Sequence, residues 1–398
     1  AARTYSTYVV GLNSALISAM MFLGGVAQLN LANGSIRFIP ALGKGTMRFV
    51  VTSYLVSLVM AGLVGLGFLA GLDYWAESID FIGENHILVA WFILSTMGWC
   101  IFVLQDGVLT GLRRATWVPV ENTLFSVLKI ILMLLFVTIL PPLGIFASWS
   151  VGLAITLLPT NYYIFRKLIP FHAQTTAPTS NPIGYAQIGK YVAGDYLGAL
   201  AWLACTQLLP VIVTQVAGPT ANAYFYLSWQ IAVLLFTITS NMGSSLIVEA
   251  AANEKNLLEY TRRTFLQQAA IIIPSALILA IGAPLVLRLF GKAYASEGAA
   301  LLRLLSLAAI PNIVISIFIS HARVQRKIRR VVLVLVSTSL AIIISSYYLL
   351  HVVGIIGVGY AWLGCQTIGA IFVTVYILIS RKSSQRHREV QPERETQS

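Results

Sequence analysis

The stretch VVGLNSALISAMMFLGGVAQLNLANGSIR, residues 9–37, holds 29 residues, and its one charged side chain is the last, Arg37. A helix of about 20 apolar residues is long enough to cross the roughly 30 Å hydrocarbon core of a bilayer. Similar apolar runs recur along the 398-residue chain, which is 58% hydrophobic and 10% charged. Soluble domains average about 25% charged residues. The sequence therefore predicts an all-α polytopic membrane protein.

Eleven membrane-spanning helices are expected from these runs. They are predicted near residues 8–39, 49–70, 88–111, 119–139, 145–165, 187–215, 222–248, 265–289, 298–320, 331–351 and 355–380. If the first runs from outside to inside, 20 of the 26 Lys and Arg residues lie on the inner side. The acidic loop at 73–84 then lies outside. This asymmetry follows the positive-inside rule and predicts a multi-pass protein of the cell (inner) membrane with a cytoplasmic C-terminus.

The formal net charge of +12 reflects this topology and contact with anionic membrane lipid of the inner leaflet. No nucleic-acid partner is needed to explain it. Cys100, Cys205 and Cys365 lie singly in separate predicted spans. We therefore expect no metal or redox motif and no cofactor.

The chain also repeats. GIFASW (144–149) and GVGYAW (357–362) share a Gly and a Trp at an offset of 213 residues. The same offset places Arg113-Arg114 on Arg326-Lys327. Because an outside start is unusual for eleven spans, we expect one more helix upstream of Ala1 and hence two six-helix bundles, related as parallel repeats. The predicted parts are an N-terminal bundle (1–168) lacking its first helix, a cytoplasmic linker (169–186), a C-terminal bundle (187–380) and a basic, polar cytoplasmic tail (381–398).

Five segments carry a resemblance to a known family. They are AARTYSTYVVGLNSALISAM (1–20), GSIRFIPALGKG (34–45), QDGVLTGLRRATWVPVENTLFSVLKI (105–130), ANAYFYLSWQIAVLLFTITS (221–240) and LLRLLSLAAIPNIVISIFISHARVQRKIRR (301–330). With them the chain resembles the polysaccharide-export flippases, in the superfamily shared with MATE-type multidrug exporters and lipid II flippases. The resemblance extends to about Lys382 and implies two bundles around a central cavity that opens alternately to each side of the membrane.

The same resemblance implies a cargo, a sugar chain on a polyprenyl pyrophosphate that passes from the inner to the outer leaflet for cell-surface polysaccharide synthesis. Polysaccharide assembly enzymes are then possible partners. Such a cargo needs cationic anchors for its phosphates and a polar path for its glycan. Charged residues inside spans are costly and are functional hypotheses by default.

Lys129 is the clearest of these residues, since it is mid-span in VENTLFSVLKIILMLLF. Asn122, Ser126 and Lys129 are spaced i, i+4, i+7 and share one helical face. Lys129 either lines the cavity or forms a structural ion pair with Asp106, which is expected at comparable depth on the preceding span. Both interpretations hold if the pair rearranges during transport. Glu121, at the inner end of the same span, is expected to be a solvated acid at headgroup level.

A second face groups Tyr191, Asp195 and Trp202 at helical spacing. An acid beside aromatic rings suits sugar hydroxyls or a coupling cation, and the alternative is a satisfied contact near the inner surface. Arg3 resembles an arginine of the family at the end of the missing helix.

Arg37 either anchors topology or binds phosphate at the inner mouth of the cavity, and the resemblance favours phosphate. The 32 residues of the predicted span 8–39 would cover about 48 Å as one straight helix, more than the bilayer needs. A tilt, a break at Asn33-Gly34 or a protrusion would absorb the excess length.

Two other functions remain open. A cation-coupled small-molecule exporter of the same fold would need a prominent acidic site in the first bundle. A membrane glycan polymerase or ligase would need a large outer domain, whereas the longest predicted outer loop has about 17 residues. No catalytic Ser-His-Asp or His-Glu grouping is evident, so we expect a transporter and not an enzyme.

Overall fold

The computed structural model describes residues 2–75, 77–176, 185–252 and 256–390. Every regular element in these ranges is helical, so the predicted all-α class is confirmed. The chain divides into two compact units, residues 1–226 and 227–398. The bundle, linker and tail boundaries expected from the sequence stay predictions.

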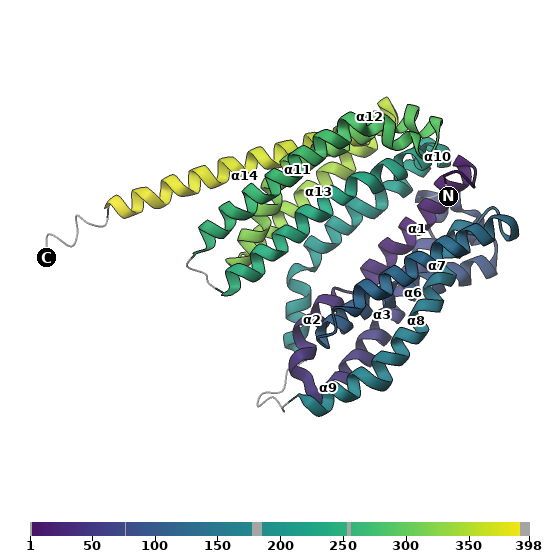
Figure 1. Ribbon diagram of the computed structural model, residues 1–398, viewed down its shortest axis with the longest axis horizontal. Helices are drawn as coiled ribbons and strands as arrows, with labels where there is room; N and C mark the ends of the chain where they lie inside the picture. The colour runs from purple at the N-terminus through teal and green to yellow at the C-terminus, as the bar shows by residue number, and fades with distance from the viewer. Residues whose placement is uncertain (1, 76, 177–184, 253–255, 391–398) are drawn as a thin grey trace. The chain divides into compact units, whose positions relative to one another are not determined.

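The first unit contains nine consecutive helices among its described residues, followed by the start of a tenth (Figure 1). They are α1 (Thr7–Ala27), α2 (Leu31–Leu42), α3 (Thr46–Leu69), α4 (Leu72–Trp75), α5 (Phe81–Glu84), α6 (His86–Gly111), α7 (Trp117–Ile139), α8 (Gly144–Tyr163) and α9 (Ile169–Thr175). A π-helical turn, Ile164–Leu168, joins α8 to α9.

The long α10 (Tyr185–Ala252) begins in the first unit and ends in the second. It bends at Gly218, whose φ of 84° and ψ of 164° are not helical. Glycine adopts this backbone without the steric cost that a Cβ would bring. The second unit continues with α11 (Leu257–Arg288), α12 (Lys292–Val324), α13 (Ile328–Val353) and α14 (Ile356–Val390).

Nine stretches of described helix are long and apolar enough to cross a membrane. One of them, Tyr196–Ile247, contains the bend at Gly218 and therefore holds two helices. Counting these two separately and adding the 20-residue α8 gives the eleven predicted spans. The chain is a multi-pass membrane protein.

The first predicted span is broken earlier than expected. Helix α1 ends at Ala27, Leu29 and Asn30 adopt left-handed backbone with φ of 49° and 59°, and Asn33-Gly34 lies inside α2. Asparagine tolerates this conformation better than most residues. The Asn30 side chain also donates to Val192 O at 3.2 Å and accepts from Asn33 Nδ2 at 2.7 Å. These bonds place the break at Asn30.

Helix α2 is held against α6 by a close approach. Gly107 and Gly111 lie one turn apart on α6, and a Cβ on either would come within 2.5 Å of a carbonyl oxygen, of Ala32 or of Ser35. Small residues at this spacing let membrane helices pack backbone to backbone.

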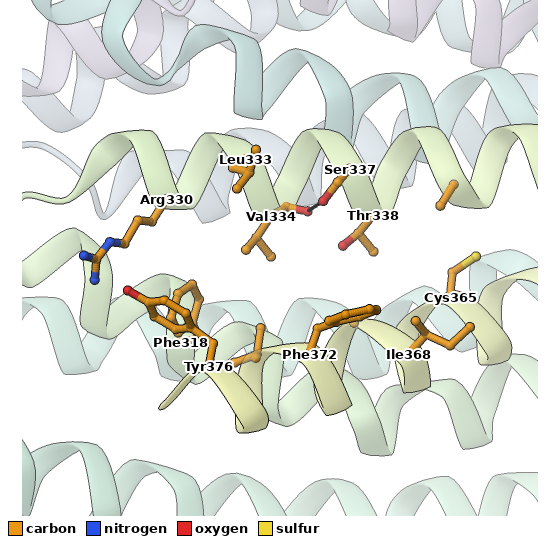
Figure 2. Close-up of a pocket in the computed structure, with 13 residues that line it drawn as sticks. Phe318, Arg330, Leu333, Val334, Ser337, Thr338, Cys365, Ile368, Phe372 and Tyr376 are labelled. Atoms are coloured by element: carbon orange, nitrogen blue, oxygen red, sulfur yellow. Dashed lines mark hydrogen bonds between the residues drawn. The ribbon is translucent and has the colours of Figure 1, made fainter. Parts of the chain in front are cut away.

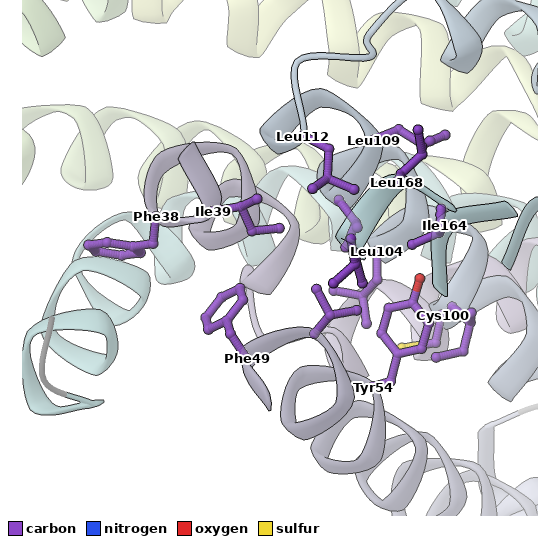
Figure 3. Close-up of a cluster of buried hydrophobic side chains, with 14 of the residues drawn as sticks. Phe38, Ile39, Phe49, Tyr54, Cys100, Leu104, Leu109, Leu112, Ile164 and Leu168 are labelled. Atoms are coloured by element: carbon purple, nitrogen blue, oxygen red, sulfur yellow. The ribbon is translucent and has the colours of Figure 1, made fainter. Parts of the chain in front are cut away.

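The hydrophobic core beside this contact joins α2, α3, α6 and the α8–α9 junction (Figure 3). Helix α2 contributes Phe38 and Ile39, which are 5% and 0% exposed. The neighbouring Arg37 is exposed, because it lies on the opposite side of the helix from the buried Ile39. The packing therefore fixes which face of α2 presents the guanidinium.

The predicted repeat is visible in the backbone. Arg113 and Arg326, 213 residues apart, both have positive φ, 60° and 58°. Arg113 N–H donates to Thr110 O at 3.0 Å and Arg114 N–H to Leu109 O at 2.9 Å. The same two bonds recur 213 residues later, where Arg326 N–H donates to Arg323 O at 3.0 Å and Lys327 N–H to Ala322 O at 2.9 Å. Both turns are Schellman motifs, which close a helix with one left-handed residue.

Candidate functional site

A chain of polar side chains crosses the first unit and links four helices. The Tyr54 hydroxyl on α3 donates to Asn161 Oδ1 on α8 at 3.0 Å. Asn161 Nδ2 donates to Gln105 Oε1 on α6, and Gln105 Nε2 donates to Glu121 Oε1 on α7. Tyr54, Gln105 and Glu121 are 9%, 0% and 3% exposed. This chain is a buried network that ends on a carboxyl group.

The expectation that Glu121 is a solvated headgroup-level acid is wrong. Helix packing buries its carboxyl group against Gln105, although the residue lies in the first turns of α7. Asp106, next to Gln105 on α6, accepts from Asn122 Nδ2 at 3.5 Å. Among the described residues neither Glu121 Oε2 nor Asp106 Oδ1 has a hydrogen-bond partner, although both atoms are buried. Two carboxyl groups therefore share one polar region inside the first unit.

Lys129 lies farther along α7 in an aromatic environment. Its Nζ is 4.1 Å from the ring centroid of Trp149 and 5.0 Å from that of Phe125. Trp99 and Phe102 extend this cluster, with centroids 5.8 Å from Trp149 and 5.2 Å from Phe125. Cation–π contacts at these distances contribute about 0.5–2 kcal/mol. The ammonium group is thus supported by ring faces.

The sequence predicts an ion pair between Asp106 and Lys129, and the structure does not bring the two side chains together. Asp106 lies five residues before the end of α6, whereas Lys129 lies twelve residues after the start of α7. The seven-residue difference corresponds to roughly 10 Å along the helix axis. Asn122 is the residue of α7 that lies level with Asp106, as their hydrogen bond shows.

The two predicted arginines are exposed, one on α2 and one before α1. Arg37 is exposed on α2, with its Cζ 5.9 Å from the ring centroid of Phe38. Arg3 is exposed and precedes α1. Their roles in binding phosphate stay predictions.

The second predicted face lies on α10. Trp202 is half-buried there. The backbones of Tyr191 and Asp195 belong to the same helix, but their side chains lie outside the described part of the chain. The proposed role of this face in sugar or cation binding also stays a prediction.

The repeat offers a test of whether the fold itself requires these polar groups. At the offset of 213, five polar or charged residues of the first unit correspond to apolar residues in the second. Gln105, Asp106, Glu121, Asn122 and Lys129 correspond to Phe318, Ile319, Val334, Leu335 and Ile342. The shared backbone therefore forms without them, and a functional reason for keeping costly groups in the membrane becomes stronger.

Sequence reasoning missed Tyr54, Gln105 and Asn161 as members of the site. An amide side chain within a span was the available signal, because it needs a hydrogen-bond partner in a medium without water. In the described ranges no group of three or more His, Cys, Asp or Glu side chains could hold a metal ion.

Comparison with known proteins relates the chain to transporters through structure alone. No family model and no curated protein matches it. An inward-facing multidrug resistance MATE family transporter of the MOP superfamily superposes with a TM-score of 0.74 at 15% identity, covering 96% of this chain and 93% of that one. A MOP superfamily transporter from Pyrococcus furiosus, for which reverse polarity of the binding pocket suggests a different function, gives 0.63 at 17%, covering 93% and 86%.

A mutant of the Vibrio cholerae MATE transporter VcmN is also similar, with a TM-score of 0.62 at 13% identity and 96% of each chain covered. Identities this low establish architecture and leave the cargo open. The chain has the fold of the MATE transporters of the MOP superfamily.

Proposed function

We propose that the protein is a flippase that moves a polyprenyl-pyrophosphate-linked oligosaccharide from the inner to the outer leaflet by alternating access. The transporter fold and the resemblance of the sequence to polysaccharide-export flippases support this proposal. It includes an inner-membrane location with a cytoplasmic C-terminus and contact with polysaccharide assembly enzymes.

The observation that carries the proposal is the ammonium of Lys129 on its aromatic cluster. A lysine at the centre of a span costs about 2.5–3.5 kcal/mol on insertion scales. Among the described residues Asp106 lies level with Asn122 and not with Lys129, and the second unit has Ile342 at the corresponding position, so the scaffold does not require the lysine. A cation beside Trp149 and Phe125 suits a cargo that combines anionic phosphates with sugar rings.

Reconstitution tests this function directly. The full-length protein is placed in liposomes that contain a polyprenyl-pyrophosphate oligosaccharide with a fluorescent sugar. A membrane-impermeant quencher then measures the fraction of label in each leaflet. We expect rapid exchange of the label with the parent protein, slow exchange with Lys129→Met, and parental rates with Lys44→Met, which removes an exposed lysine from the turn at Gly43–Gly45.

The alternative, a cation-coupled small-molecule exporter, gains support from the buried carboxyl groups of Asp106 and Glu121. This is the acidic site in the first unit that such an exporter would need. The same liposomes, loaded with a cationic dye and given a proton or sodium gradient, distinguish the two functions. Gradient-driven dye transport that is lost in Glu121→Gln, without exchange of the labelled lipid, would favour the exporter over the flippase.

A further inference from the structure

The second unit contains an apolar groove between α13 and α14, with α12 at its base. Its cavity volume is about 540 Å³. Figure 2 shows Leu333 and Thr338 of α13 on one wall and Ile368 and Phe372 of α14 on the other. Leu333, Ile368 and Phe372 are 69%, 55% and 71% exposed, so the groove opens on the surface of the unit.

Side-chain size explains why the groove is open. Ser337, Thr338 and Ala341 line the wall formed by α13. At the offset of 213 their counterparts on α7 are the larger Leu124, Phe125 and Leu128. In the first unit Phe125 is 4% exposed, and its ring lies close to Gly152, the counterpart of Cys365. The smaller Thr338 therefore leaves open in the second unit a space that Phe125 occupies in the first.

The end of the groove near the turn between α12 and α13 carries a positive charge. Arg330, in the first turn of α13, has its Cζ 5.4 Å from the ring centroid of Tyr376 on α14. The corresponding pair in the first unit is Trp117 and Tyr163, whose ring centroids are 4.9 Å apart. The first unit thus has two aromatic rings at this position, and the second unit has an exposed guanidinium against a ring.

The length of the groove matches one leaflet. The lining runs from Arg330 to Ala341 on α13 and from Tyr376 back to Cys365 on α14, which is eleven residue steps along each helix. Eleven helical residues rise about 16 Å, and half of the hydrocarbon core is about 15 Å. Arg330 therefore lies at headgroup level when Cys365 lies near the bilayer centre.

We propose that this groove is a binding site for one acyl chain of an anionic phospholipid, with its phosphate on Arg330, in the leaflet nearest the turn between α12 and α13. The apolar walls suit a hydrocarbon chain, and the charge at one end fixes the headgroup. A single guanidinium lines the groove among the described residues, which matches the single negative charge of a phosphodiester better than a pyrophosphate. The lipid is a resident partner and not the cargo.

Native mass spectrometry of the purified full chain tests this site. The protein is titrated with phosphatidylglycerol or phosphatidylethanolamine of identical acyl chains, and the fraction that retains one lipid is measured. We expect phosphatidylglycerol to be retained at lower concentration. Arg330→Gln should weaken its retention about 5-fold. The same change should weaken retention of phosphatidylethanolamine less, because the ammonium of that headgroup already offsets the charge of its phosphate. The matched control Arg329→Gln removes an adjacent exposed charge that does not line the groove, and it should have little effect.

Ala341→Leu introduces the leucine that the first unit has at the corresponding position, Leu128, and should lower retention of both lipids. Ser337→Leu does the same on the same wall if the first variant does not fold. If Arg329→Gln weakened retention of phosphatidylglycerol as much as Arg330→Gln, the lipid would be attracted by the general positive charge at the start of α13, and the proposed site would be wrong. Unchanged retention after the groove is filled would also overturn it. Displacement of phosphatidylglycerol by an equal concentration of polyprenyl phosphate would assign the groove to the cargo.

Discussion

Replacing Lys129 by methionine is expected to stabilise the protein and impair transport. An uncompensated lysine at mid-span costs about 2.5–3.5 kcal/mol. The rings of Trp149 and Phe125, 4.1 and 5.0 Å from the ammonium, return roughly 1 kcal/mol each at a half-buried position. About 1 kcal/mol of cost remains. Lys129→Met removes the charge and keeps an apolar chain of similar length, so the free energy of unfolding should rise by about that amount.

The assay combines reversible unfolding in detergent micelles with the leaflet-exchange measurement in liposomes. A double-mutant cycle with Trp149→Leu isolates the contact between the ammonium and the ring. Trp149→Leu should cost about 1 kcal/mol more in the parent than in the Lys129→Met background, because only the parent loses a cation–π contact. Stability and transport are then read on the same four proteins.

Two outcomes would refute this reasoning. A clear loss of stability in Lys129→Met would mean that the lysine has a structural ion partner, as we first expected with Asp106. Parental transport by a correctly inserted Lys129→Met protein would mean that the ammonium has no role in the cargo path. A coupling energy near zero in the cycle would show that the ring faces do not support the charge.

Three further predictions concern topology and charge. A membrane-impermeant thiol reagent added outside should label cysteines introduced at 73–84 and not at 322–330, and the reverse pattern would invert the orientation. Arg37→Ala should export little glycan at matched membrane level, and Arg37→Lys should be intermediate because lysine lacks the planar fork that binds two phosphate oxygens; normal export by Arg37→Ala would leave it a topology anchor. Asp106→Asn and Lys129→Met should have additive effects on stability, since the two side chains do not pair, and rescue of the first by the second would show a pair in another transport state.

Most of the helical architecture could be predicted from the sequence because a bilayer restricts the options. A backbone in hydrocarbon must satisfy its own hydrogen bonds, so long apolar runs become helices. The break between α1 and α2 could not be located in this way. It lies at Asn30 and not at Asn33-Gly34, because the Asn30 side chain bonds to Val192, 162 positions away. A long-range contact of that kind is not visible in local composition.

In the candidate site, too, single residues could be predicted from the sequence but their contacts could not. Lys129 stood out in the sequence because any charge in a span is costly, whereas its aromatic support depends on Trp149 from the next helix. Glu121 was misjudged because distance from the end of a span says nothing about which neighbours cover a side chain. Its burial against Gln105 requires α6 and α7 to meet at that height. Single residues could be proposed from the sequence, and their partners required the fold.

The internal repeat turns these observations into a comparison within one molecule. Both units close a helix at Arg113 and Arg326 with the same backbone geometry, so differences at matched positions isolate what each unit adds to a common scaffold. The first unit adds buried carboxyl groups and Lys129, and the second replaces them with apolar residues and opens a groove that ends at Arg330. Polar groups that only stabilised the scaffold would be expected in both copies. Their restriction to one copy supports the two roles proposed above, in which Lys129 of the first unit meets a charged cargo and the groove of the second unit binds a lipid.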